Sequence, residues 1–164
     1  AVGNGVADDK AIYTFVPDMI KYYLNEDPIL KNVPTFQLEN KDHMKHVFDD
    51  IGNMVIKKTN GSGGYGMLMG HAATEQEIAE YKIEVLKDPR QFIAQPIISL
   101  SSAPCYMNGK LQPRRIDLRP YALCGPDGIE IVPGGLTRVA LREGSLVVNS
   151  SQGGGSKDTW VLAT

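Results

Sequence analysis

The feature that most constrains the fold is a lysine-bearing apolar segment that runs directly into a glycine-dense one. Val55-Ile56-Lys57 lies in a segment, residues 53–59, that is typical of a strand. Residues 60–64 are rich in turn formers, and residues 65–69 can form the returning strand. The pattern predicts a β-hairpin with an enlarged, mobile tip.

This hairpin has a composition suited to polyphosphate. Glycines let several backbone N–H groups converge on one anion, and a lysine beside them adds a point charge. The segment is neither a Walker A loop nor a dinucleotide fingerprint, because its glycines close a hairpin and no helix begins there. It predicts a phosphate clamp, with an ordinary flexible hairpin as the alternative, built from Lys57, Gly61, Ser62, Gly63, Gly64 and Gly66.

Helical patterns surround the hairpin. Apolar residues at three- and four-residue spacing predict a helix of about four turns from Asp8, with Pro17 as an interior breaker. A second helix is expected over residues 42–51, where His43 and His46 share a face but lack a third ligand and so receive no chemistry. A third begins at Thr74, which forms a capping box with Glu77 and precedes an apolar face of Ile78, Tyr81, Val85 and Leu86.

The second half of the chain reads largely as sheet, so the predicted class is α+β. Apolar or alternating segments lie between glycine and proline punctuation at 91–100, 115–124, 128–133, 136–142 and 145–149. The glycine-rich segment 150–156 suits a second loop over phosphate or substrate, with a disordered linker as the alternative. The apolar residues 160–162 predict that the chain then returns to the body of the protein.

Charge and composition favour a small-molecule partner. Seventeen Lys and Arg against nineteen Asp and Glu leave a net charge of -2, which argues against nucleic acid and anionic membranes as partners. No apolar run approaches the roughly 20 residues of a membrane span, and no signal peptide is evident, so a cytoplasmic location is expected. Cys105 and Cys124 are expected to be reduced, partly buried thiols.

Five segments carry a resemblance to a known family. They are residues 5–10 (GVADDK), 61–67 (GSGGYGM), 116–120 (IDLRP), 134–140 (GGLTRVA) and 149–160 (NSSQGGGSKDTW). Together they resemble the circularly permuted ATP-grasp proteins, bacterial proteins related to the glutathionylspermidine synthases. The resemblance covers nearly the whole chain.

The resemblance implies roles for individual residues. In ATP-grasp proteins one lysine stands at the start of a helix and another on the strand before a glycine-rich loop, which implies that Lys10 and Lys57 grip the nucleotide phosphates. The family's hinge strand matches residues 92–96 and places Gln95 beside adenine, where Glu is commoner. The expected catalytic residues, with a surface ion pair as the alternative for each arginine, are Arg119, Arg142 and Asn149.

The family's magnesium-binding Glu-x-Asn strand is not complete in this sequence. Residues 147–149 (VVN) supply the Asn without the Glu. In permuted members that strand lies upstream, so the resemblance, together with an opening AVGNG that lacks Met, predicts a C-terminal fragment whose Mg²⁺ ligands are unknown. Asp117 and Glu130 could serve as ligands, but structural roles are expected for both.

The implied activity is ATP-dependent ligation of a carboxylate to an amine through an acyl phosphate, by a fragment that is inactive alone. Expected partners are ATP, small-molecule or peptide carboxylates and amines, and the remainder of its own chain. The expected parts are a helical segment (1–52), a lid (53–96) and a C-terminal sheet (97–164). The alternatives are a non-catalytic nucleotide-binding module, and a protein-interaction domain in which Lys10 and Lys57 would lie far apart.

Overall fold

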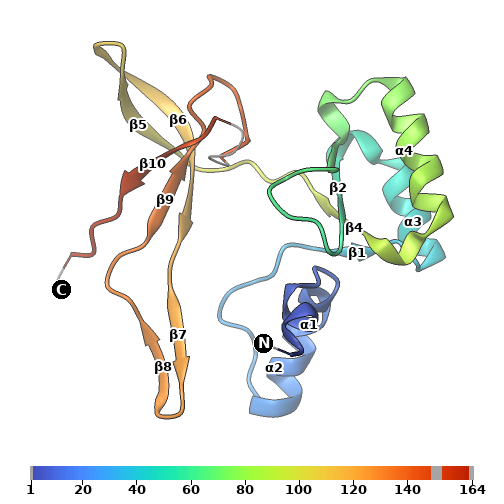
Figure 1. Cartoon of the computed structure of the whole chain (residues 1–164), viewed down its shortest axis with the longest axis horizontal. Helices are drawn as coiled ribbons and strands as arrows, with labels where there is room; N and C mark the ends of the chain where they lie inside the picture. Colours follow the sequence, from blue (N-terminus) through green and yellow to red (C-terminus); the bar gives the residue numbers. More distant parts are fainter. Residues whose placement is uncertain (1, 149–152, 163–164) are drawn as a thin grey trace. The chain divides into compact units, whose positions relative to one another are not determined.

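The chain divides into two compact units, Ala1–Ile97 and Ile98–Thr164 (Figure 1). The computed structural model describes residues 2–148 and 153–162. Both units contain antiparallel sheet, and the helices lie in the first, so the predicted α+β class is confirmed. Within the described part of the chain, no helix is long and apolar enough to cross a membrane.

The first unit begins with short helical segments instead of the single helix expected from Asp8. α1 spans Asn4–Asp8, a 3-10 turn η1 spans Ile12–Phe15, and α2 spans Val16–Leu24. Pro17 lies in the first turn of α2, so the prediction of an interior breaker is wrong. Its missing N–H costs nothing there, because the first N–H groups of a helix have no intrahelical acceptor.

A four-stranded antiparallel sheet forms the centre of the first unit, in the order β1-β4-β2-β3. The strands are β1 (Phe36–Gln37), β2 (Met54–Lys58), β3 (Leu68–Met69) and β4 (Phe92–Pro96). The predicted hairpin therefore exists, but only two residues pair on its returning side, Leu68 with Ile56 and Met69 with Val55. Its connection is longer than the five-residue turn expected.

Two helices cover one face of this sheet (Figure 1). They are α3 (Lys41–Asp49) and α4 (Glu75–Lys87), and the short 3-10 segments η2 (Ile51–Asn53), η3 (Gly70–Ala72) and η4 (Pro89–Gln91) link them to the strands. The buried core between helices and sheet consists of Leu38, Val47, Met54, Ile56, Leu68, Val85, Phe92 and Ala94.

Details of the two helices test the sequence predictions. The capping box of Thr74 and Glu77 is confirmed, with both reciprocal hydrogen bonds formed. Leu86 was predicted on the apolar face but is 57% exposed. His43 and His46 do share a face, and both rings pack on the Phe36 ring, with centroids 5.5 and 4.9 Å away.

Gly70 shows why one position accepts only glycine. A Cβ atom built on Gly70 would lie 1.7 Å from the carbonyl oxygen of Ile51, far inside van der Waals contact. η3 therefore packs against η2 backbone to backbone, which any side chain would prevent.

The second unit is built from β-strands. A four-stranded antiparallel sheet has the order β10-β9-β6-β5, and β7 pairs with β8 in a separate hairpin (Figure 1). The strands are β5 (Ser102–Met107), β6 (Lys110–Arg119), β7 (Ala122–Gly125), β8 (Gly128–Ile131), β9 (Leu136–Val139) and β10 (Gly155–Asp158).

Three strand predictions in this unit need correction. β5 and the first half of β6 went unpredicted because Pro104 and Pro113, which usually interrupt strands, face each other in the register. Residues 145–148, expected as a strand, form none. Residues 155–156, expected within a second loop, instead begin β10, where Gly155 pairs with Val139.

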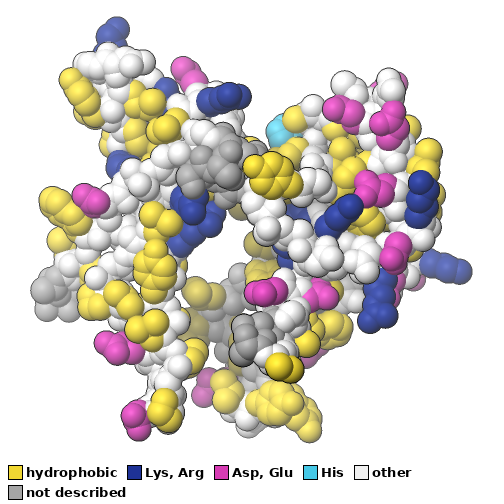
Figure 2. All heavy atoms as spheres, viewed as in Figure 1, with side chains coloured by type: hydrophobic (Ala, Val, Ile, Leu, Met, Phe, Trp, Pro, Cys, Tyr) yellow, Lys and Arg dark blue, Asp and Glu magenta, His cyan; other side chains and the backbone are white. Residues whose placement is uncertain are grey.

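Side chains expected to be covered are exposed in several places. Cys105 is buried but Cys124 is exposed, and both thiols are free. Trp160, Val161 and Leu162 are exposed instead of packed in the body of the unit. The β7–β8 hairpin is exposed along its whole length, and Figure 2 shows hydrophobic side chains over it.

Candidate functional site

The pairing of β2 with β4 brings two predicted site residues onto one face of the sheet. Lys57 lies opposite Ile93, and Val55 lies opposite Gln95. Directly paired residues of an antiparallel ladder point to the same face, and diagonal neighbours remain within reach of long side chains. Lys57 and Gln95 are such a diagonal pair, on the face opposite to the core.

Gln95 connects Lys57 to the segment before β1. The Lys57 Nζ donates to the Gln95 Oε1 at 2.7 Å. The Gln95 Nε2 donates to the Thr35 Oγ1 at 2.8 Å, and the Thr35 hydroxyl donates to the Val33 carbonyl at 2.9 Å. Every polar atom of the Gln95 side chain therefore has a protein partner.

Lys10 reaches the same region from the N-terminal segment. It lies in the turn between α1 and η1 and does not open a helix as predicted. Its backbone N–H donates to the Thr59 carbonyl at 3.0 Å. Its Nζ donates to the carbonyl oxygens of Thr59, at 3.3 Å, and of Gly61. Lys10 thus joins the end of β2 to the glycine-rich loop.

The two lysines line one pocket of about 220 Å³, whose other lining residues are Tyr13, Ile93 and Gln95. Burial lowers the pKa of the Lys57 ammonium, and the positive charge of Lys10 lowers it further. Within the described part of the chain, neither lysine has a carboxylate partner. The pocket therefore holds two cationic groups whose hydrogen-bond acceptors are neutral oxygens, an arrangement that favours an anionic ligand.

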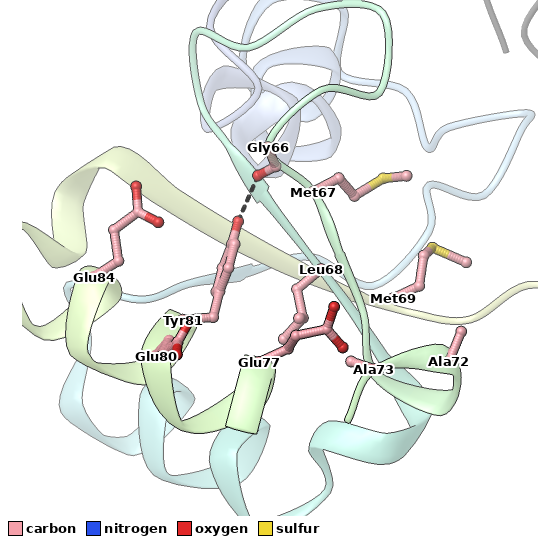
Figure 3. Close-up of a pocket in the computed structure, with 10 residues that line it drawn as sticks. All are labelled: Gly66, Met67, Leu68, Met69, Ala72, Ala73, Glu77, Glu80, Tyr81 and Glu84. Carbon is pink, nitrogen blue, oxygen red and sulfur yellow. Dashed lines mark hydrogen bonds between the residues drawn. The ribbon is translucent and has the colours of Figure 1, made fainter. Parts of the chain in front are cut away.

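The glycine-rich loop is held at both ends by side chains. Lys10 bonds the Gly61 carbonyl, and the Tyr81 hydroxyl of α4 donates to the Gly66 carbonyl at 2.7 Å (Figure 3). Between these points Gly63, Gly64 and Gly66 have φ values of 67°, 79° and 66°, a left-handed conformation that other residues adopt at a cost. The sequence of the loop and its backbone conformation therefore agree.

A larger pocket of about 530 Å³ lies between α4 and the segment that ends in β3 (Figure 3). Of the predicted site residues, only Gly66 lines it. Its three carboxylates already have partners in the protein: Glu77 accepts from Thr74, Glu80 from Gln76 and Glu84 pairs with Lys58. Size alone therefore does not locate the functional site, and the smaller lysine-lined pocket has the chemistry predicted from the sequence.

The remaining predicted site residues belong to the second unit. Arg119 is exposed, and its Nη2 pairs with the Asp117 carboxylate at 3.0 Å, which matches the surface ion pair kept as the alternative. Arg142 is exposed as well. Asn149 lies outside the described residues. Among the residues with described positions, no group of three or more His, Cys, Asp or Glu could hold a metal ion.

Sequence reasoning missed several residues of the site. Tyr13 follows Lys10 by three positions, and Ile93 precedes Gln95 by two on the same strand face, so local spacing could have indicated both. Thr35 and Tyr81 carried no comparable signal, because Thr35 is 60 residues from Gln95 and Tyr81 is 15 residues from Gly66.

The fold is of the α+β class, with a lysine pair beside a glycine-rich loop. The sequence profile of circularly permuted ATP-grasp type 2 proteins matches residues 1–140. The chain belongs to the circularly permuted ATP-grasp type 2 family, as the resemblance implied.

Similar proteins come from several bacteria. An uncharacterized protein of Synechocystis sp. is 54% identical over 99% of this chain and 34% of its own length. An uncharacterized protein of Mycobacterium tuberculosis (strain H37Rv) is 53% identical over 99% of this chain and 30% of its own length. A protein of Frankia casuarinae named "Putative glutamate--cysteine ligase 2-2" is 44% identical over 98% of this chain and 18% of its own length. The chain spans about a third of the first two relatives.

Proposed function

We propose that the pocket between Lys10 and Lys57 binds the phosphates of ATP. The observation that supports this most directly is the placement of two lysines, from segments 47 residues apart, around one pocket without a carboxylate among its lining residues. A triphosphate would supply the negative charge that these ammonium groups lack, through charge-assisted hydrogen bonds. The interaction-domain alternative predicted that the two lysines lie far apart, which this geometry contradicts.

The hairpin would act as a lid in this proposal. The glycine-rich loop, residues 61–66, would close over the phosphates with its backbone N–H groups, while Lys10 and Tyr81 hold its ends. The hinge strand β4 would border adenine through its backbone, and residues 53–96 would form the family's lid. The left-handed glycines of this loop support that role.

The reaction would be ligation of a carboxylate to an amine. A carboxylate oxygen of the substrate attacks the γ-phosphorus of ATP, and the bond between that phosphorus and the β–γ bridging oxygen breaks. ADP departs, and the substrate has become an acyl phosphate. The amine nitrogen then attacks the acyl carbon, a C–N bond forms, phosphate departs and the nitrogen loses a proton. The protein needs no nucleophile of its own, and its lysines position and stabilise negative charge.

Substrates and further catalytic residues are also proposals. The name of the Frankia relative favours amino acid substrates. Arg119, Arg142 and Asn149 would face the transferring phosphoryl group or the acyl acceptor. Mg²⁺ would accompany ATP; among the described residues no group of three or more His, Cys, Asp or Glu could hold it.

The test is titration of the intact protein with Mg-ATP, comparing wild type with Lys57→Met. We expect the mutant to bind at least ten-fold more weakly, the equivalent of one charge-assisted hydrogen bond. Lys87→Met removes the same charge from an exposed site at the end of α4 and should bind as wild type.

Equal affinity of wild type and Lys57→Met would contradict the phosphate clamp. ATP binding without phosphate release, when candidate amino acids and amines are supplied, would instead favour the non-catalytic nucleotide-binding module.

A further inference from the structure

Gln95 occupies an unusual place for a residue expected to contact adenine. Its Oε1 accepts from the Lys57 ammonium, and its Nε2 is occupied by the Thr35 hydroxyl. The carbonyl oxygen of the side chain thus faces the lysine, so the amide can affect the position of the Lys57 ammonium.

Two independent constraints fix the orientation of the amide. An ammonium group only donates hydrogen bonds, so the atom facing Lys57 must be the carbonyl oxygen. The Thr35 hydroxyl uses its single hydrogen on the Val33 carbonyl, so it can only accept from Gln95, and the atom facing it must be the nitrogen. Both requirements select the same orientation, which a flip of the amide would break at both ends.

The neutral amide also leaves the charge of Lys57 intact. A carboxylate at this position would form an ion pair with Lys57 and reduce the charge of the lysine pair from two to one. Gln95 instead supplies an acceptor of nearly the same shape without a negative charge, so that both lysines remain available to a polyanion.

We propose that Gln95 is a positioning residue, locked by Thr35, which holds the Lys57 ammonium in the pocket without neutralising it. The inference rests on the proposed phosphate site and adds that Gln95 acts on the polyphosphate through Lys57, in place of a role confined to adenine. It concerns specificity as well, because a site with two uncompensated lysines should favour the most highly charged phosphate chain.

The experiment separates phosphate from adenine by titrating the intact protein with inorganic tripolyphosphate and with adenosine. Gln95→Glu preserves size and should weaken tripolyphosphate binding by at least ten-fold, while adenosine affinity changes little. Thr35→Val, which removes the lock but leaves the charges alone, should weaken tripolyphosphate binding by a few-fold. Gln76→Glu makes the same exchange at an exposed site on α4 and is the matched control.

A double-mutant cycle shows whether the effect passes through Lys57. In a Lys57→Met background, Thr35→Val, which changes no charge, should have little further effect on tripolyphosphate binding. If Gln95→Glu binds tripolyphosphate as tightly as wild type does, or if the effect of Thr35→Val is undiminished without Lys57, the positioning role is wrong while the phosphate site stands. If wild type binds neither ATP nor tripolyphosphate, the proposed function itself fails and this inference with it.

The pH profile supplies a measurement that mere loss of structure would not change. Burial and Lys10 lower the pKa of Lys57, so binding by wild type should decline below the pH at which an ordinary lysine deprotonates. A carboxylate at position 95 favours the charged lysine, so in Gln95→Glu the decline should move to higher pH. Lys10 and Tyr13, the other titratable groups of the pocket wall, are common to both proteins, and β4 contributes none. An unshifted profile would count against the proposal.

Discussion

At the scale of the residue, the charge of Lys57 favours anion binding but lowers the stability of the protein without a ligand. Its ammonium is half-buried beside Lys10, and its hydrogen-bond acceptor is the neutral Gln95 amide. A charge that loses hydration without gaining a counter-charge destabilises the empty protein, and an anion that binds only the folded state restores stability. We interpret this local cost as the condition for a strong phosphate contact.

The lowered pKa of Lys57 makes this cost visible in unfolding experiments. Because its pKa is lower in the folded than in the unfolded chain, the unfolded chain binds more protons between the two values, and stability rises with pH there. Wild type should therefore gain stability relative to Lys57→Met as the pH rises through the lowered pKa of the folded state towards the ordinary lysine value of about 10.4. Urea unfolding of both proteins along this range measures the difference, with Lys87→Met as the charge control. A difference that is flat or falls with pH would contradict the prediction.

At the scale of the element, the glycine-rich loop depends on α4. The Tyr81 ring packs edge-on against Phe92, and its hydroxyl reaches the Gly66 carbonyl at 2.7 Å. Burial, and to a lesser extent Glu84, raises the pKa of Tyr81 to about 12, so the hydroxyl remains a donor at all physiological pH values. The helix therefore fixes where the loop returns to β3.

Removing this hydroxyl should loosen the loop without unfolding the unit. Tyr81→Phe keeps the ring contact but loses the hydrogen bond to Gly66, which is worth about 1 kcal/mol or less. We expect faster amide hydrogen exchange in residues 62–67 and unchanged exchange in the core strand β2. Tyr106→Phe, at an exposed position of the second unit, is the control. Loop exchange equal to that of wild type would show that Tyr81 does not hold the loop.

At the scale of the whole molecule, each unit exposes large apolar side chains. On α2, Tyr22, Tyr23 and Leu24 are 81%, 75% and 62% exposed. Exposed apolar patches of this kind commonly mark surfaces that another part of a protein covers. The Synechocystis and Mycobacterium tuberculosis relatives have about three times the length of this chain, so we expect additional chain in the intact protein to pack on α2.

Oxidative footprinting of the intact protein tests this expectation. Tyr22 and Tyr23 should be labelled more slowly than Tyr65, which is 70% exposed in the glycine-rich loop and serves as an internal reference. The reason is that a packed ring is shielded from reagent, whereas a ring on a loop remains accessible. Labelling of Tyr22 and Tyr23 at the rate of Tyr65 would show that α2 stays uncovered.

Local patterns were sufficient for much of the first unit. The capping box of Thr74 and Glu77, the strand that carries Lys57 and the glycine-rich turn depend on neighbours within a few residues, and all three are present. The prediction failed for β5 and the first half of β6, where each strand contains a proline that is tolerated because of its position in the pairing with the other strand. There each proline reads as a breaker alone, yet Pro104 and Pro113 face each other in the ladder.

The sequence by itself determined the α+β class, the family and the residue types of the candidate site, because these depend on composition, spacing and motifs. Only the tertiary structure decided which of those residues meet. Lys10, Lys57 and Gln95 line one pocket because β2 and β4 pair in a single register and the turn after α1 bonds to Thr59. The lock on Gln95 joins residues 60 positions apart, and such a contact exists only once the chain has paid the entropy of closing the intervening loop.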